Sequence, residues 1–336
     1  MAYYREIAPK PYELVPFAEK TPRSPCQGHH KYNQDLFTGV LELSLHTERP
    51  VQVASGYRDF TKDNSGRENL ASVMPVVEKG GKQWHVIPGS SLKGALRSIV
   101  EAISPSCLPF SSKKLRQLIP DQVRKCASKE HLCPACRLFG VTGGGKNSYQ
   151  GNLFFEDIFV DPRDIELWRT PILWTPGGRS KLIPRRYLSN NKLAGRKFYY
   201  HGKSATGPDS RVVVKQGVNL GTKISFENLS EAFLGLVVAA LGLAPQYPFL
   251  IKVGAGKPVG MGSIRVDLKG ISLMGSIEGT GRMVGSLKKL ENIVEQLSKW
   301  VNAACGEGLI IPDNLKKLAE ILGEKTLNRQ SPKGLY

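Results

Sequence analysis

The sequence predicts an α+β protein in which helices cover one face of an antiparallel sheet. Apolar residues alternate with polar ones over residues 37–53, which is typical of a half-buried strand. They recur every three or four positions over 91–103, as in an amphipathic helix, and dominate 232–245, as in a buried one. The predicted elements follow one another as strand, helix, strand, strand, helix, strand. This order favours an α+β sandwich.

The other elements are predicted from local signals along the chain. Residues 1–36 are polar and rich in proline, and they predict an extended N-terminal arm. Residues 54–69 have no apolar period and predict a loop. Gly80 and Gly81 predict a hairpin between strands at 72–77 and 83–87. The remaining predictions are a cysteine-bearing irregular segment at 105–145, a strand at 151–160, an insertion at 161–223, a helix at 229–243, strands at 249–253 and 262–268, and two helices within 286–325.

The length of 336 residues suits two domains or one large decorated domain. We expect one core over residues 37–270, interrupted by insertions at about 105–145 and 161–223. Residues 271–336 would then form a C-terminal helical extension. A chain of this size buries roughly three quarters of its unfolded surface, so a sizeable core is expected.

The charge balance indicates a polyanionic partner. The chain has 47 Lys plus Arg against 29 Asp plus Glu, a net charge of +18. Such an excess most often serves nucleic acid and less often an anionic membrane surface. The apolar run at 232–245 is shorter than the ~20 residues that a spanning helix needs, and the first residues lack the apolar region of an export signal. We therefore expect no membrane partner and a reducing cytoplasm, in which the six cysteines stay unpaired.

Over half of the excess charge lies in one segment of the predicted insertion. Residues 179–223 contain eleven Lys or Arg, Arg185 and Arg186 among them, and one acid, Asp209, so that 11 − 1 = +10. Aromatic residues are interleaved with these cations: Tyr187, Phe198, Tyr199, Tyr200 and His201. Cations neutralise phosphates and aromatic rings stack on bases, so the segment predicts single-stranded RNA binding. The alternative is a solvated basic loop.

Three of the six cysteines lie close together in the sequence, with a histidine between them. Cys126, His131, Cys133 and Cys136 could supply three thiolates and an imidazole to a closed, tetrahedral, structural zinc site. Cys107 could replace one of these ligands. The alternative is that the reduced cysteines pack as small hydrophobic side chains.

The start of the helix predicted at 91–103 could bind phosphate. Ser90 or Ser91 could cap it, and free N–H groups at a helix N-terminus attract anions. Lys93 and Arg97 are four residues apart and project from the same side of the helix. The alternative is an ordinary capped helix with solvated cations.

Several motifs, in order along the chain, resemble those of one family. Four strings resemble motifs of the RAMP superfamily, the repeat-associated proteins of CRISPR effector complexes. They are IPGSSLKGALRSIVE at 87–101, CPACRLFG at 133–140, GNLFFEDI at 151–158 and GAGKPVGMGSIRV at 254–266. Three further strings resemble the type III backbone branch of this superfamily, which binds CRISPR RNA. They are PYELVPF at 11–17, TGVLELSLHTERPVQV at 38–53 and GRKFYYHG at 195–202.

The resemblance implies a core like an RNA-recognition motif, or ferredoxin-like, with a thumb-like basic insertion. It also implies subunits that pack along one guide CRISPR RNA, pair it with target RNA and contact the other effector subunits. Ser90, Ser91 and Lys93 would lie on guide phosphates, with Arg97 beside them. Lys257 matches the family's basic loop position near the RNA. The glycines around Lys257 would also suit a tight hairpin with positive φ angles.

Some members of the family cut target RNA with an acidic residue in the loop after the first strand, where a Mg or Mn ion would activate a 2′-hydroxyl. The matching loop offers Asp59 as first candidate and Asp63 as second. Val73 stands where the family usually has its Asp, which favours a non-catalytic scaffold. The alternatives are a subunit that also cuts target RNA and a stand-alone RNA-processing nuclease.

Overall fold

The computed structural model of the chain describes residues 11–25, 28–63, 65–109, 116–142, 148–173, 185–277 and 283–331. The helices are α1 (Gly89–Ile103), α2 (Pro134–Phe139), α3 (Glu231–Ala240), α4 (Ile293–Gly306) and α5 (Pro312–Leu322). The strands of the main sheet are β3 (Phe37–Thr47), β9 (Leu153–Phe155), β16 (Asn219–Leu229), β17 (Ile251–Lys252), β18 (Ser263–Ile277) and β19 (Met283–Lys289).

The main sheet has the strand order β17-β18-β3-β16-β9, and β19 pairs with the outer part of β18. All of these pairs are antiparallel. The long central strand β3 forms because its residues alternate: Leu41, Leu43 and Leu45 are buried, whereas the residues between them are partly exposed. The apolar side of the sheet therefore faces one core.

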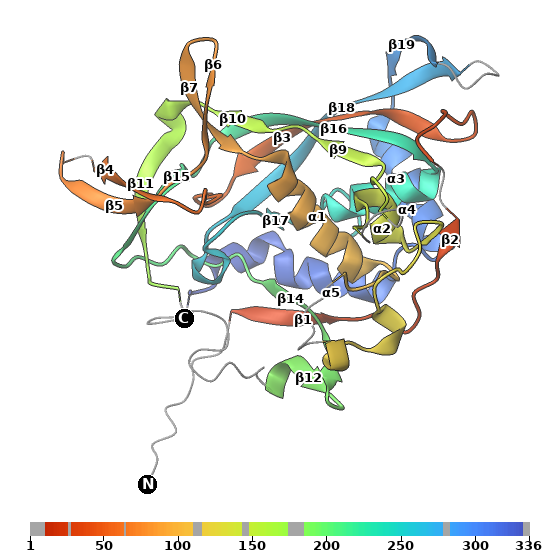
Figure 1. Cartoon of the computed structure of the whole chain (residues 1–336), viewed down its shortest axis with the longest axis horizontal. Coiled ribbons are helices and arrows are strands. Elements are labelled where there is room, and N and C mark those ends of the chain that lie inside the picture. Colours follow the sequence, from red (N-terminus) through yellow and green to blue (C-terminus); the bar gives the residue numbers. More distant parts are fainter. Residues whose placement is uncertain are drawn as a thin grey trace.

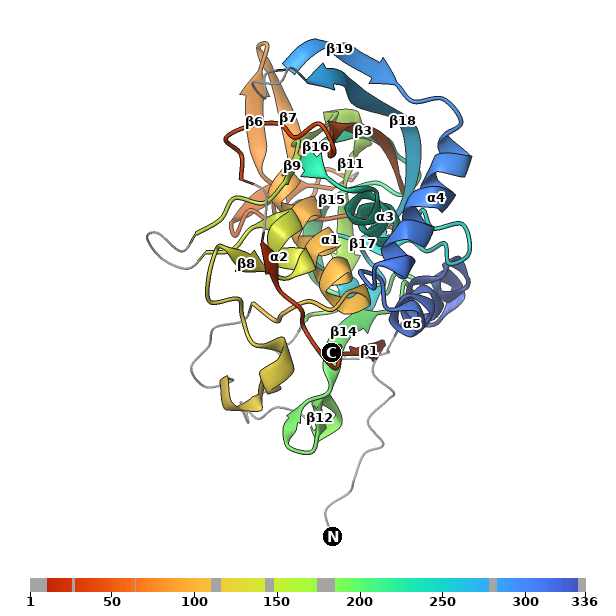
Figure 2. The ribbon, with the colours of Figure 1, turned by 90° about the vertical axis from the view of Figure 1, so that its right-hand side faces the viewer.

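Helices α1 and α3 lie against that apolar side, with α4 and α5 beyond them, as Figures 1 and 2 show from two directions. α1 buries Leu92, Leu96 and Ile99 on one face, and α3 is buried on nearly every residue. Asn314 of α5 donates to the carbonyl of Ala102 in α1 at 2.8 Å and so connects two helices that are distant in sequence. The predicted α+β class, with antiparallel strands and helices, is confirmed.

A second sheet lies at one end of the main sheet and has the order β11-β15-β5-β4. Its strands are β4 (Arg58–Lys62), β5 (Glu68–Ser72), β11 (Ile165–Thr170) and β15 (Asp209–Val214). The prediction of a loop over 54–69 is therefore wrong, since β4 and β5 form a hairpin. The residues of this hairpin show no apolar alternation because β4 is exposed on both faces, with Phe60 69% accessible.

A neighbouring hairpin follows the prediction from the glycine pair. β6 (Val76–Lys79) and β7 (Lys82–Ile87) pair antiparallel, and β10 (Ile158–Val160) adds to β7. Gly80 and Gly81 have φ of 61° and 71°, which is the left-handed backbone that a two-residue turn requires. The hairpin projects from the body of the protein in Figures 1 and 2.

The predicted insertion at 161–223 contains regular structure besides β11 and β15. The short elements are β12 (Leu188–Ser189), β13 (Lys192–Leu193) and β14 (Gly195–Tyr199), and the core strand β16 already begins at Asn219. β14 pairs antiparallel with β1 (Tyr12–Pro16), so part of the predicted N-terminal arm is a strand. Two further residues of that arm, β2 (Ser24–Pro25), pair with β8 (His131–Leu132).

Residues 200–203, which follow β14, form backbone hydrogen bonds with residues near both ends of the described chain. Tyr200 N donates to Pro11 O at 3.0 Å, Gly202 N donates to Thr326 O at 2.9 Å, and Lys203 N donates to Arg329 O at 2.8 Å. Within this segment His201 is fully buried, and its ring contacts Ser263 Oγ and Leu322 O. Burial lowers the pKa of His201 to about 3. The expectation that His201 stacks on an RNA base is therefore wrong.

Candidate metal centre and basic surface

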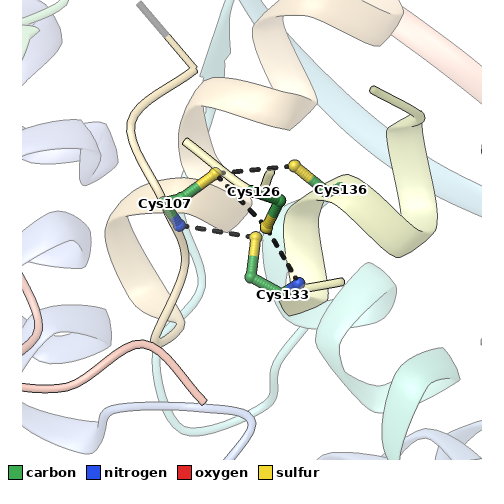
Figure 3. A group of neighbouring side chains, drawn as sticks. All are labelled: Cys107, Cys126, Cys133 and Cys136. Carbon is green, nitrogen blue, oxygen red and sulfur yellow. Dashed lines mark hydrogen bonds between the residues drawn. The ribbon is translucent and has the colours of Figure 1, made fainter. Parts of the chain in front are cut away.

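Four buried cysteines from three segments converge beside helices α1 and α2. Cys107 follows the end of α1, Cys126 follows the turn Asp121–Val123, Cys133 is the N-cap residue of α2, and Cys136 lies in its first turn. Their sulfur atoms all lie within 4.8 Å of one another (Figure 3). In the described part of the chain, this is the group of metal-ligating side chains close enough to hold an ion.

The distances between the sulfur atoms suit a tetrahedral ion. Zinc–sulfur bonds of about 2.3 Å in a tetrahedron place sulfur atoms about 3.8 Å apart. The Cys107 and Cys136 sulfurs are 3.5 Å apart, and the Cys126 and Cys107 sulfurs 3.9 Å. Four thiolates are the ligands that zinc prefers in closed structural sites. The residues present therefore fit a structural metal ion.

Backbone N–H groups also point at the sulfurs. Cys107 N donates to the Cys133 sulfur and Cys133 N donates to the Cys126 sulfur, each at 3.4 Å (Figure 3). Such donors stabilise the negative thiolate form that binds metal. The contact with the Cys107 side chain lowers the pKa of Cys126, and it lowers the pKa of Cys133 to about 7. The contact with Cys126 raises the pKa of Cys107, and the contact with Cys107 raises the pKa of Cys136.

The predicted ligand set is corrected at one position. His131 is exposed in β8 and does not belong to the cluster, whereas Cys107 does. Cys107 was the alternative ligand, and it lies 19 residues before Cys126 in the sequence. It reaches the site because the chain turns back after α1: Leu108 N donates to Val123 O at 2.7 Å, directly before the segment that bears Cys126.

Arg97, one of the predicted RNA contacts, points toward this cluster. Its Nη2 donates to the Cys136 sulfur at 3.7 Å, and its Nη1 donates to the carbonyl of Gly140 at 2.9 Å. Its Nε donates to Glu101 at 2.8 Å. The guanidinium is thus surrounded by protein acceptors.

The other predicted residues of α1 lie at its N-terminal end. The prediction that Ser90 or Ser91 caps this helix is wrong, because the N-cap residue is Pro88 and no side chain caps it. Instead, Gly89 N donates to the Asp157 carboxylate at 2.7 Å, so a protein anion occupies part of the predicted phosphate site. Ser90 is exposed and Ser91 partly so.

Lys93 and Lys257 are cations in partly buried positions. Lys93 Nζ lies 3.4 Å from the carbonyl of Leu153, and burial lowers the pKa of Lys93, with a further contribution from the charge of Arg97. Lys257 begins a short 3-10 helix between Gly256 and Gly260, both with positive φ, and burial lowers its pKa. The glycines of this loop thus serve its turns, as the alternative interpretation required.

Arg185 and Arg186 are exposed at the start of the short 3-10 helix Arg185–Tyr187. The Arg186 guanidinium lies 4.1 Å from the centre of the Tyr12 ring, a cation–π contact between the basic insertion and β1. Tyr187 stacks on the same ring at 5.4 Å. Tyr187 therefore packs against β1, which differs from the prediction that it stacks on a base.

The two candidate acids lie in the β4–β5 hairpin with different surroundings. Asp59 is exposed, and one of its oxygens accepts from the N–H of Phe60 at 2.8 Å. Asp63 shapes the turn: it accepts from Ser65 Oγ at 2.6 Å and from Asn69 Nδ2 at 3.1 Å. The hydrogen bond from Ser65 is the main reason that the pKa of Asp63 is lowered to about 2.

Sequence reasoning missed Asp157, which contacts the start of α1, and Glu101 and Arg196, which pair near its end. Glu101 is buried in α1 and forms ion pairs with both Arg97 and Arg196. A signal for Glu101 was present, because it follows Arg97 by four residues, a spacing that pairs charges on a helix. The contact with Arg196 joins segments 95 residues apart, and no local pattern indicates it.

Comparison with known proteins identifies one family. The model of the RAMP superfamily matches residues 73–265, which include α1, the four cysteines and the strands β9, β16 and β17 of the main sheet. No curated protein matches the chain. Among the described residues, no helix is both long enough and apolar enough to cross a membrane.

Proposed function

Because the chain belongs to the RAMP superfamily, we propose that it is a guide-RNA-binding backbone subunit of a type III CRISPR interference complex. In this role it grips the backbone of the CRISPR RNA and presents it for pairing with target RNA in antiviral defence. The family match over residues 73–265 carries the proposal. The net charge of +18 supports a polyanionic partner.

The strand order supports a core like an RNA-recognition motif. Along the chain, β3, α1, β9, β16, α3 and β18 succeed one another as β-α-β-β-α-β. In the sheet these strands lie in the order β18-β3-β16-β9, which is fourth, first, third, second. This is the arrangement of the ferredoxin-like split β-α-β fold, to which RNA-recognition motifs belong. The β3 residues on the side opposite the buried leucines are partly exposed.

Cations at several places would hold the RNA backbone. Lys93 near the start of α1, Lys257 in the glycine-rich loop, and Arg185 and Arg186 in the basic insertion are the proposed phosphate contacts, with Ser90 and Ser91 as hydroxyl donors. Lys93 and Lys257 are partly desolvated, so an arriving phosphate would recover electrostatic energy there.

We further propose that the four-cysteine site holds zinc and that its role is structural. The four thiolates leave no open coordination position for a reactant. The ion would join the end of α1 to α2 and to the segment between them. The site thus belongs to an insertion at about residues 105–145, and the basic segment forms a second insertion. The core that contains them begins at residue 37 and extends beyond the predicted boundary at 270, because β18 and β19 belong to its sheet.

For cleavage of target RNA, we propose that this subunit is a scaffold. Asp63 uses its carboxylate to build a turn, which leaves Asp59 as the exposed one of the two candidate acids. The test is single-turnover cleavage of complementary RNA by the assembled complex with Mg²⁺ or Mn²⁺. Cuts that disappear with Asp59→Ala, while RNA binding is kept, would overturn the scaffold proposal.

The principal test of the proposed function is the RNA carried by the protein. Purified from its host, the protein should hold RNA of discrete length together with sister subunits. In a direct titration, Lys93→Ala should weaken binding of guide RNA about threefold to tenfold. It should also reduce the slope of log affinity against log salt concentration by the amount that corresponds to about one phosphate contact. Lys316→Ala, a change at an exposed lysine on α5, is the matched control. Equal binding by the two variants would contradict the phosphate contact.

A further inference from the structure

Arg97 connects the metal centre to the interior of the protein. Its three donor groups go to three different acceptors: the sulfur of Cys136 at 3.7 Å, the carbonyl of Gly140 at 2.9 Å and the carboxylate of Glu101 at 2.8 Å. A guanidinium can satisfy such a set because its N–H groups form a rigid planar fork. Arg97 therefore fixes the position of one ligand and of the turn that ends α2.

Glu101 carries the contact onward to the basic insertion. Its side chain is 2% exposed, and its second oxygen pairs with Arg196 of β14. Arg196 is itself mostly buried, at 18% exposure. An isolated buried carboxylate is very unfavourable, so each of the two arginines stabilises Glu101. Arg97, Glu101 and Arg196 thus form one continuous chain of contacts that begins at Cys136. We name these three charged side chains the charge array.

The electrostatics of the array depend on metal. A divalent ion with four thiolates carries 2 − 4 = −2 formal charges. The side chains of Arg97, Glu101 and Arg196 carry 2 − 1 = +1. With the ion bound, the positive array lies beside a negative centre, and hydrogen bonds to a charged sulfur are stronger than those to a neutral thiol. Without the ion, no metal bond holds the Cys136 sulfur, and the Nη2 group of Arg97 loses the fixed acceptor that it contacts at 3.7 Å.

We propose that Arg97 is a positioning residue of the metal centre, and that the charge array makes metal binding and the docking of β14 mutually dependent. β14 pairs with β1 and carries Lys197 directly after Arg196. It also follows Arg185 and Arg186 closely in the chain. Metal loading therefore controls the docking of β14 and, if the proposed function holds, the affinity for RNA.

The first experiment measures metal binding without RNA. Arg97→Met should lower zinc affinity about 10–100-fold in a chelator competition, the usual effect of losing an outer contact to a ligand. In cobalt-substituted protein the sulfur-to-cobalt charge-transfer band should move to lower energy, because loss of an N–H···S bond raises the energy of the sulfur lone pairs. Arg124→Met is the matched control, since Arg124 lies in the same insertion but pairs with Asp121 at the surface. Equal zinc affinities and an unshifted band would overturn the positioning role.

The second experiment tests the coupling in both directions. Hydrogen exchange of the β14 and β1 amides should become faster when a chelator removes zinc from the wild-type protein. Binding linkage is reciprocal, so Arg196→Met, far from the ligands in sequence, should lower zinc affinity as well. Unchanged exchange in β14 on metal removal, or unchanged zinc affinity in Arg196→Met, would overturn the coupling. Where a Met variant fails to fold, Arg97→Lys and the isosteric Glu101→Gln provide the same comparison, with smaller losses of zinc affinity expected.

The third experiment separates this inference from the proposed function. Guide RNA should bind the zinc-loaded protein more tightly than the chelated protein, and the difference should shrink in Arg97→Met. Failure of every form to bind RNA would contradict the proposed function, whereas the zinc affinity and exchange results would still decide the coupling. RNA affinity that is the same with and without zinc would overturn the control of RNA binding by metal.

Discussion

Asp63 shows how one carboxylate can be dedicated to a turn. Both of its oxygens accept hydrogen bonds within residues 63–69, and Arg169 approaches one of them at 3.7 Å. Such an arrangement is typical of Asx turns, in which a short acidic side chain replaces backbone contacts. The carboxylate of Asp63 therefore maintains the shape of the hairpin on which Asp59 is displayed.

The titration of Asp63 provides a prediction at this scale. Its pKa is about 2 in the folded protein, below the value near 3.9 of an unfolded chain. A lowered folded pKa means that the contribution of Asp63 to stability is present above pH ~4 and is lost as the pH falls toward 2. Carbon-detected NMR of the side-chain carboxyl should show its midpoint near pH 2. A midpoint near pH 4 would contradict the turn geometry.

The identity of the fourth metal ligand leads to a second prediction. Cys107→Ser should abolish stable binding of about one zinc per chain, because it removes one of four thiolates. His131→Ala should retain the full zinc content, since His131 is exposed and outside the cluster. Metal analysis of reduced protein after chelator-free purification measures both. Zinc loss in His131→Ala with retention in Cys107→Ser would reverse the assignment.

At the scale of elements, the packing of α3 against α4 depends on a glycine. A side chain at Gly235 would place its Cβ 1.9 Å from the carbonyl oxygen of Trp300 in α4. Trp300 is one of the largest fully buried side chains of the protein and also contacts Phe37 at the start of β3. The close approach of the two helices therefore positions the C-terminal part of the chain against the core.

Gly235→Ala should therefore destabilise the protein by about 1–3 kcal/mol, the usual cost of forcing atoms into a filled core. Gly94→Ala is the matched control, since Gly94 lies in α1 and a Cβ added there would have no atom from outside this helix within 4 Å. That change should raise stability by about 0.5–1 kcal/mol through its helix preference. Denaturant unfolding compares both with the wild type. Equal stability of the two variants would contradict the tight contact.

The sequence predicted an element correctly where one face of that element is buried and the other is exposed. The alternation in 37–53 and the periodicity in 91–103 predicted β3 and α1, because a strand or helix with one buried face must repeat its apolar residues. The hairpin of β4 and β5 was missed because both of its faces are largely exposed. Glu101 and Arg196 were missed because their contact depends on tertiary structure. For the fourth metal ligand, the sequence alone allowed either His131 or Cys107, and the structure shows that Cys107 lies with the other three cysteines.

At the scale of the whole molecule, the basic charge is unevenly distributed. The segment 179–223 contributes +10 of the total +18. Part of this segment is held in place by β1, since β14 pairs with β1 and Arg186 lies over the Tyr12 ring. The basic insertion is thus attached to the rest of the protein by hydrogen bonds and cation–π contacts.

The paired change Arg185→Ala with Arg186→Ala should weaken guide RNA binding across unrelated sequences and reduce the slope of affinity against salt by about two phosphate contacts. The matched control is Lys316→Ala with Lys317→Ala on α5. Binding titrations at several salt concentrations measure the slopes. Losses confined to particular bases, with the salt slope unchanged, would contradict contact with the RNA backbone.

The contacts of residues 200–203 with both Pro11 and residues 326–329 have a consequence for folding kinetics. They join positions that are more than a hundred residues apart, which raises the contact order of the protein and slows the search for the native pairing. During translation the segment cannot complete its hydrogen bonds until residues 326–329 have left the ribosome. The last-formed part of the native structure should therefore lie in the middle of the chain, and pulse-labelled hydrogen exchange during refolding should detect protection there later than in β3 and β16.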